Sequence, residues 1–286
     1  MVKNKLFSLL AVLVLPLVAS AQTVSGGGLP PLTPVEKHVY DTAHAKIYYE
    51  YAFRRDSAKA DKLTRGQTVL LVGDAYTCFI DNQALLRDSL TDAFCRKGKS
   101  PMEYMAKNMS LENPVYEYSL VSGLKSGEVS VRFDSPSLKL QYVQPTPKLA
   151  WTLAAGDSVV SGVKCKKAVC RFGGRDWTAW YSPEYGLPLG PYMFGGLPGL
   201  IFAVGDGRGD HVFTLNGVEL CRGVVQVYQR ADDGIIKLPR DKARETIRKY
   251  YEDLSNFILM KYPGTALPDD LQGKKLSAPY NPIELE

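Results

Sequence analysis

The chain of 286 residues is 45% hydrophobic and 23% charged, and its formal net charge is +5. This composition excludes wholesale disorder, collagen and a disulfide-stabilised mini-protein, because the chain can bury a large apolar core. The basic residues are scattered, so they do not predict binding to nucleic acid. Seventeen tyrosines and only three histidines favour β-structure and disfavour a histidine-based metal centre. We therefore expect no metal and no cofactor.

The N-terminus has the three parts of a secretory signal peptide. Two lysines precede an uncharged apolar run over residues 6–19, and an Ala-Ser-Ala site ends at Ala21. The run is shorter than the roughly 20 residues that a spanning helix needs. Residues 1–21 are therefore predicted to be a signal peptide cleaved after Ala21, which would place the mature chain in the periplasm or outside the cell. No transmembrane span is expected in that mature chain.

The first elements of the mature chain show two hydrophobic periods, one typical of strands and then one typical of helices. Apolar and polar residues alternate over Lys46–Arg54, which predicts a strand, and residues 68–80 are expected to form a hairpin. Apolar residues then recur at spacings of three and four, which predicts a helical insertion over about 81–108. Within it, Ser100 is expected to cap a second helix, and Glu103 to complete a capping box.

The rest of the chain predicts more strands and one helix. Segments of period two separated by Gly-rich turns over residues 115–228 favour antiparallel strands. An apolar stripe then predicts a long C-terminal amphipathic helix over about 239–262. The expected fold class is α+β and mainly antiparallel β, a curled antiparallel sheet with the helical insertion and this long helix. A flexible tether over 22–36, a single β-rich domain over 37–264 and a tail over 265–286 complete the organisation.

The sequence offers one chemical candidate, a cysteine. It contains neither the zinc-protease and redox-cysteine motifs nor the serine nucleophile elbow. Cys165 and Cys170 lie on one predicted strand, where their Cα atoms would be roughly 16 Å apart, too far for a disulfide. With five cysteines in total, at least one thiol of a monomer stays unpaired. An Arg-Gly-Asp tripeptide over residues 208–210 is interpreted as turn chemistry.

The most distinctive stretch runs from Gly190 to Ile201. Pro198 followed by Gly199 predicts a type II turn, and two adjacent glycines before it let another backbone or a ligand approach closely. The stretch is apolar, so it cannot itself perform acid–base chemistry. Its aromatic residues, together with two tryptophans upstream, predict a hydrophobic groove in the sheet.

This region resembles the GLPGLI family, whose name is the hexapeptide Gly196–Ile201 of this chain. The resemblance extends from Trp151 to about Asp206, and Cys165 matches the family's cysteine whereas Cys170 does not. It implies a secreted protein of Bacteroidota with a signal peptide, and it implies no known activity or catalytic residue. The matching residues occur in the family's order: Trp151, Gly162-Val163-Lys164-Cys165, Gly174-Arg175-Asp176-Trp177, Gly190-Pro191, Phe194 and the hexapeptide.

Two functional hypotheses follow. The first is a non-enzymatic binding or accessory protein of the cell envelope that recognises a hydrophobic small molecule such as a lipid, a peptide or an envelope protein. The second is a thiol-dependent hydrolase or redox enzyme that uses Cys165. For the first hypothesis, the candidate contact residues are Arg175, Trp177, Trp180, Tyr192, Phe194, Leu197 and Pro198.

Overall fold

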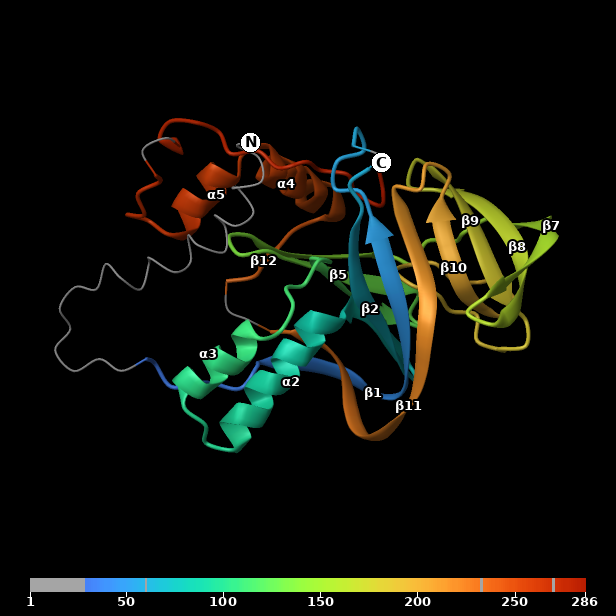
Figure 1. Ribbon diagram of the computed structural model, residues 1–286, viewed down its shortest axis with the longest axis horizontal. Coiled ribbons are helices and arrows are strands. Elements are labelled where there is room, and N and C mark those ends of the chain that lie inside the picture. Colours follow the sequence, from blue (N-terminus) through green and yellow to red (C-terminus); the bar gives the residue numbers. More distant parts are fainter. Residues whose placement is uncertain (1–28, 60, 232–233, 269–270) are drawn as a thin grey trace.

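One twelve-stranded sheet organises the part of the chain that the structure describes (Figure 1). The structure is a computed structural model that describes residues 29–286 except 60, 232–233 and 269–270, so the predicted signal peptide lies outside the described residues. The strands are β1 Lys37–Phe53, β2 Thr64–Gly73, β3 Tyr76–Asp81, β4 Tyr118–Gly123, β5 Glu128–Asp134, β6 Lys139–Pro145, β7 Thr152–Val160, β8 Val163–Phe172, β9 Arg175–Ser182, β10 Leu200–Asp206, β11 His211–Arg230 and β12 Ile236–Lys237.

The sheet is open and almost wholly antiparallel. Its order is β12-β6-β5-β4-β3-β2-β1-β11-β10-β9-β8-β7, and only the β12–β6 pair is parallel. Short connections join β2 to β3, β4 to β5, β5 to β6, β7 to β8 and β8 to β9, and they favour antiparallel pairing because a parallel pair needs a long crossover. The hairpin predicted over residues 68–80 is present as β2 and β3.

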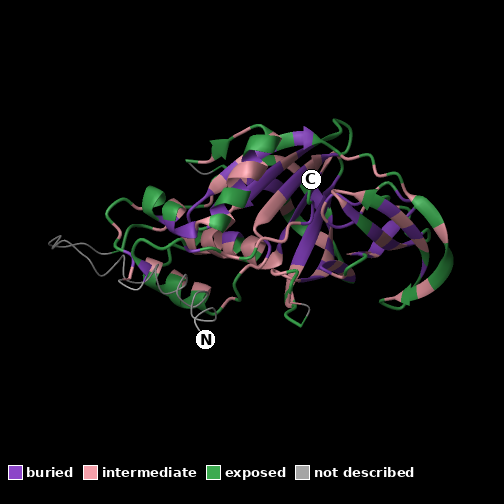
Figure 2. Cartoon of the chain, turned by 90° about the horizontal axis from the view of Figure 1, so that it is seen from above, coloured by how far each residue is buried: buried purple, intermediate pink, exposed green. Residues whose placement is uncertain are grey.

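Alternate residues along the strands build two hydrophobic cores, one on each face. Leu70 pairs with Phe79 on one face, whereas Leu71 pairs with Cys78 on the other. The larger core continues along the sheet as far as β8, β9 and β10, and Figure 2 shows buried positions along the strands. The edge strand β7 contrasts with this, since most of its residues are exposed.

Two helices lie on each side of the sheet in Figure 1. These are α2 Asn82–Arg96 and α3 Pro101–Met109 on one side, and α4 Arg240–Glu252 and α5 Leu254–Lys261 on the other. Asp81 caps α2, and Ser100 caps α3 with the predicted capping box to Glu103. Among the described residues, no helix is both long and apolar enough to cross a membrane.

The predicted fold class is wrong in its long C-terminal helix. Residues 239–262 form two short helices that meet at Asp253, whose backbone is extended at φ −153° and ψ 76°. The Asp253 carboxylate accepts from the Asn256 amide and so begins α5. The Leu254 amide donates to the Leu276 carbonyl at 2.7 Å, so a bond to the tail replaces a helical one. The fold is a twelve-stranded, mostly antiparallel sheet with four short helices among the described residues.

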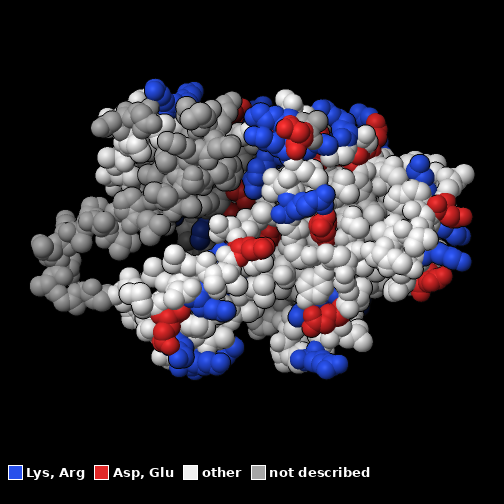
Figure 3. Space-filling model, viewed as in Figure 1, with Lys and Arg blue, Asp and Glu red and all other residues white. Residues whose placement is uncertain are grey.

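One side of α4 packs on the sheet and the other is charged. Ile247 and Tyr250 are buried against the core. Lys242 and Lys249 pair with Glu245 at 3.2 and 2.9 Å on the solvent side. Basic side chains gather around α4 at the upper edge of the molecule in Figure 3. These exposed pairs contribute little to stability, because water screens the charges.

Candidate functional site

Most of the predicted aromatic groove is core. Trp177 is 1% exposed, and its indole N–H donates to the Phe172 carbonyl at 3.0 Å. The Phe194 ring lies 4.6 Å from the Trp177 ring, and Leu197 is equally buried. Pro198 is exposed on the surface. Trp177, Phe194 and Leu197 are therefore part of the core and do not form an open groove.

Arg175 is a buried structural charge. Its guanidinium contacts Asp206 and Asp210 at 3.0 and 3.2 Å, with all three side chains at most 4% exposed. It also donates to the Asn281 side chain at 2.6 Å and to the Pro282 carbonyl at 2.8 Å. Arg175 thus ties the C-terminal segment, defined here as residues 279–284, to the sheet.

Cys165 is buried in the sheet, whereas Trp180 is half-buried. Cys165 is 2% exposed, and its Sγ donates to the Val163 carbonyl at 3.5 Å. Burial raises the pKa of this thiol, which disfavours the thiolate that a nucleophile needs. All five thiols of the described chain are free, including those of Cys165 and Cys170. Trp180 is half-buried, with the Lys167 ammonium 6.0 Å from its ring.

The hexapeptide Gly196–Ile201 makes a tighter turn than the predicted type II turn, and its backbone packs closely against that of Ser182. The Gly199 amide donates to the Leu197 carbonyl at 2.8 Å, which closes a three-residue turn around Pro198, so the predicted type II turn is wrong. Gly199 has φ +147°, and a Cβ there would lie 2.1 Å from the Ser182 carbonyl oxygen. Because backbone occupies that space, only glycine fits.

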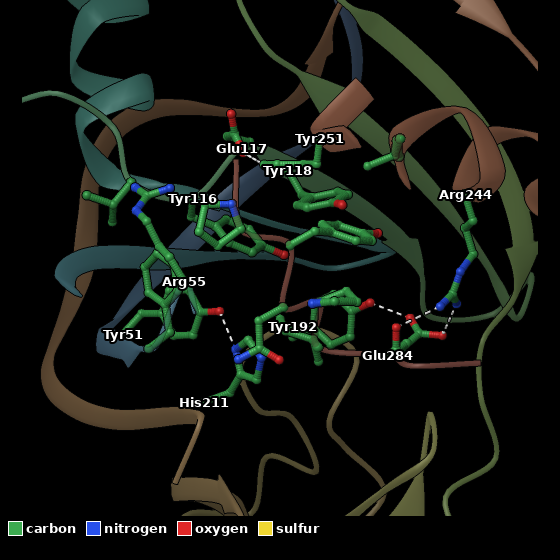
Figure 4. A pocket seen from close by; sticks show the side chains of 18 of the residues that line it. Tyr51, Arg55, Tyr116, Glu117, Tyr118, Tyr192, His211, Arg244, Tyr251 and Glu284 are labelled. Carbon is green, nitrogen blue, oxygen red and sulfur yellow. Dashed lines mark hydrogen bonds and ion pairs between the residues drawn. The ribbon is translucent and has the colours of Figure 1, made fainter. Parts of the chain in front are cut away.

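Tyr192 is the predicted contact residue that borders a cavity. Its backbone has φ +55°, which is uncommon for a residue other than glycine. Its hydroxyl donates to the Glu284 carboxylate (Figure 4). The segment before the hexapeptide therefore contributes to a site that the C-terminal segment completes.

The cavity beside Tyr192 is small and rich in tyrosine. Its volume is about 90 Å³, and it lies between the sheet, α4 and the C-terminal segment. We call it the tyrosine cavity, and Figure 4 shows its side chains converging from these elements. Its tyrosines are Tyr51, Tyr116, Tyr118, Tyr142, Tyr192, Tyr251 and Tyr280.

A neutral histidine lies at one end of the tyrosine cavity. The Tyr51 hydroxyl is 2.7 Å from His211 Nδ1, and both residues are buried. Burial, together with the nearby positive charge of Arg175, lowers the pKa of His211 to about 4. Burial also raises the pKa of Tyr51, so the tyrosine donates and the imidazole nitrogen accepts. The pair is uncharged at neutral pH.

A carboxyl group with a raised pKa lies at the other end. Burial raises the pKa of Glu117, which accepts a hydrogen bond from the Tyr251 hydroxyl. The positive charge of Arg55 acts on the same carboxyl group in the opposite direction. The hydroxyl of neighbouring Tyr116 is buried and has no hydrogen-bond partner among the described residues. A buried hydroxyl without a hydrogen-bond partner destabilises the fold by about 1–3 kcal/mol. A ligand that accepts a hydrogen bond from the Tyr116 hydroxyl would recover this free energy.

A larger cleft adjoins the tyrosine cavity across residues 115–118. Its volume is about 700 Å³, and it shares Arg55 and Tyr251 with the smaller cavity. The tyrosines that line it are Tyr116, Tyr118, Tyr228, Tyr250, Tyr251 and Tyr262. The charged residues that line it are Arg55, Arg87, Glu117, Arg132, Asp134, Lys139, Arg230 and Lys261.

Asp81 holds the shared wall in place. One carboxylate oxygen accepts from the Gln83 and Ala84 amides at the start of α2, at 2.8 and 3.4 Å. The other accepts from the Val115 and Tyr116 amides at 2.9 and 3.0 Å. Asp81 is 1% exposed, and burial raises the pKa of its carboxyl group against these four hydrogen bonds.

The C-terminal segment is anchored by side chains at both ends. Glu284 is buried and pairs with Arg240 and Arg244 at 3.0 and 2.9 Å. Asn281 donates to the Arg54 carbonyl at 2.8 Å, and the Tyr280 ring is stacked on a neighbouring tyrosine ring at 4.8 Å. The segment therefore closes the tyrosine cavity.

Sequence reasoning missed most of this site. Arg55, Tyr116 and Glu117 lie in segments whose pattern indicates only strand or loop, and the cleft brings them together with residues of α4 and α5. The one local signal was the Tyr116-Glu117-Tyr118 run, where a charged residue separates two aromatic residues at the start of β4.

Comparisons with known proteins find distant structural similarity. No protein-family model matches the chain, and a search of curated proteins gives no match. Two structures of PNGF-II, in space groups P21 and C2, resemble it with 14% sequence identity and TM-scores of 0.48 and 0.46, over 74% of this chain. The chain spans about a third of the length of those chains, which are covered to 34%. Similarity at this level supports no statement about function.

Proposed function

We propose that the chain is a secreted, non-enzymatic binding protein of the cell envelope that belongs to the GLPGLI family and binds a lipid-like small molecule. The signal-peptide pattern of residues 1–21 supports export, and the Gly196–Ile201 hexapeptide supports the family. The binding site in this proposal is the cleft beside the tyrosine cavity, because Trp177 and Phe194, which were expected to form a groove, are buried in the core.

The size and lining of the cleft carry the proposal. Its volume of about 700 Å³ lies within the range of roughly 300–1,000 Å³ that small-molecule sites occupy. Tyrosine offers an apolar ring and a polar tip, so six tyrosines suit a ligand that is itself amphipathic. Ile80, Leu254 and Ala278 add aliphatic surface to the same lining.

The geometry favours binding over thiol catalysis. Cys165 is buried, its pKa is raised, and the Val163 carbonyl is its hydrogen-bond partner. A nucleophilic thiol needs the opposite environment, an exposed position with a nearby cation or base. The Cys165 side chain is not part of the lining of the cleft or of the tyrosine cavity.

Binding of a neutral, environment-sensitive fluorophore, N-phenyl-1-naphthylamine, tests the proposal. We expect saturable fluorescence enhancement with the mature protein, and an affinity about tenfold weaker for Tyr262→Ala, because truncating a half-buried aromatic ring removes roughly 1.5 kcal/mol of apolar contact. Tyr185→Ala is the matched control, since Tyr185 is 41% exposed and lies outside the cleft. No saturable binding, or equal losses in the two variants, would contradict the assignment.

A further inference from the structure

We infer that the ligand of the cleft is an amphiphile with an anionic head group, and that the Tyr116 hydroxyl together with the lysines of the cleft recognises this head group. The inference rests on the proposed function, since it assigns the chemical class of the molecule that the same cleft binds. We commit to a free long-chain carboxylate as the occupant.

The charge of the lining is the first observation. Basic residues that border the cleft outnumber acidic ones: they are Arg55, Arg87, Arg132, Lys139, Arg230 and Lys261, against Glu117 and Asp134. A concave surface lined by one sign of charge concentrates ligands of the opposite sign. Asp134 pairs with Arg132, and buried Asp88, which is not part of the lining, pairs with Arg230, so these two arginines add no net charge. The positive excess of the lining comes from Arg55, Arg87, Lys139 and Lys261 over Glu117, and it favours an anion over a neutral or cationic ligand of the same shape.

Both acidic residues of the lining are already engaged by the protein. Asp134 accepts from the Arg132 guanidinium at 2.9 Å, and Arg132 is almost fully buried. Glu117 accepts from the Tyr251 hydroxyl, and Arg55 acts on the same carboxyl group as a nearby positive charge. Because Asp134 is paired with Arg132 and Glu117 accepts from Tyr251, the two carboxyl groups repel an anionic ligand less strongly.

The Tyr116 hydroxyl is the second, independent observation. Tyr116 is 5% exposed, it lines both the cleft and the tyrosine cavity, and its hydroxyl has no partner among the described residues. Burial raises its pKa well above the ordinary value, so the group keeps its proton and can donate. A carboxylate oxygen accepts such a bond strongly, because hydrogen bonds to charged groups contribute about 1.5–3 kcal/mol.

The apolar part of the lining accounts for the rest of the ligand. Val115, Pro136 and Leu254 border the cleft together with the tyrosine rings. Covering these side chains with an alkyl chain is favourable by about 0.8 kcal/mol for each CH₂ group buried. An inorganic anion would satisfy the charges but leave this surface in water, so the combined lining fits an alkyl carboxylate better.

Displacement of N-phenyl-1-naphthylamine by chain-matched competitors tests the inference. The competitors are dodecanoate, dodecanol and inorganic phosphate, each added to the mature protein at pH 7.5. We expect dodecanoate to compete at least tenfold more strongly than dodecanol, and added salt to weaken dodecanoate alone, because ions screen the attraction. Phosphate is expected to compete more weakly than dodecanoate.

Two variants locate the recognition. Tyr116→Phe removes the unpartnered hydroxyl and keeps the ring, so we expect about tenfold weaker binding of dodecanoate with unchanged dodecanol binding. Its melting temperature should be no lower than that of the unaltered protein, because the lost hydroxyl has no hydrogen-bond partner among the described residues. Lys261→Gln is expected to weaken the binding of dodecanoate several-fold. Tyr185→Phe and Lys164→Gln are the matched controls, since both residues lie outside the cleft and Lys164 is exposed on β8.

The outcomes separate the inference from the proposed function. Equal competition by dodecanoate and dodecanol would overturn the anionic head group and leave a lipid-like ligand in place. Stronger competition by phosphate than by dodecanoate would overturn the alkyl carboxylate. Absence of any fluorophore binding would overturn both proposals. Tighter or unchanged dodecanoate binding by Tyr116→Phe would overturn the role of that hydroxyl.

Discussion

Replacing Glu284 with glutamine removes the charge that anchors the C-terminal segment. Its carboxylate, 5% exposed, accepts from Arg240 at 3.0 Å, from Arg244 at 2.9 Å and from the Tyr192 hydroxyl. Each arginine bond would contribute about 1.5–3 kcal/mol if fully buried. The Arg240 side chain is 35% exposed, so water recovers part of its share, and the amide of Glu284→Gln keeps one acceptor oxygen. We expect a loss of about 3 kcal/mol in the free energy of unfolding.

Thermal and urea denaturation followed by circular dichroism measure this loss. A change of about 3 kcal/mol corresponds to a melting temperature lower by roughly 6–12 °C for a chain of this size. Glu252→Gln is the matched control, because Glu252 pairs with Arg248 at 3.9 Å and both side chains are more than 60% exposed. A melting temperature of Glu284→Gln equal to that of Glu252→Gln would refute the idea that the charge anchors the segment.

Two further predictions concern pH and backbone space. Because the pKa of His211 is lowered to about 4 in the folded state, only the unfolded state gains its proton between pH 6.5 and 4, so stability falls on acidification, by about 2 kcal/mol at pH 5. Urea unfolding should show a shallower loss between pH 7.5 and 5 for His211→Asn, and an unchanged pH dependence would contradict this. Gly199→Ala should destabilise by about 2 kcal/mol more than Gly162→Ala in the same assay, since both have positive φ but only Gly199 faces the backbone of Ser182. Equal losses of stability in the two variants would show that the backbone around Ser182 moves to make room for the added methyl group.

The parts of the fold that depend on local chemistry could be predicted from the sequence. Alternating residues of β1 and the hairpin of β2 and β3 follow from the period-two pattern, and the capping box of Ser100 and Glu103 follows from four neighbouring residues. The break at Asp253 was missed because the apolar stripe continues across it. An aspartate three residues before Asn256 is a helix-start pattern that competes with the stripe, and the bond from Leu254 to the tail decides in its favour.

The candidate site could not be predicted because its residues come from distant segments. Arg55 follows β1, Tyr116 and Glu117 precede β4, and Tyr251 belongs to α4, so only the folded sheet brings them together. The aromatic residues around Trp177 formed a strong sequence signal, but a tryptophan is as useful to a core as to a binding surface. Tyr192 differs from these core residues, because it borders the tyrosine cavity and its hydroxyl donates to Glu284, almost a hundred residues later in the chain.

Through its four hydrogen bonds, the Asp81 side chain connects helix α2 to the wall of the cleft. The same carboxylate begins α2 on one face and fixes Val115 and Tyr116, which border the cleft. A shift of α2 along its axis would therefore displace the wall on which the Tyr116 hydroxyl stands. Because Ala84 and Arg87 of α2 line the cleft as well, such a shift would also change the shape of the cleft, and a ligand held there would in turn resist it.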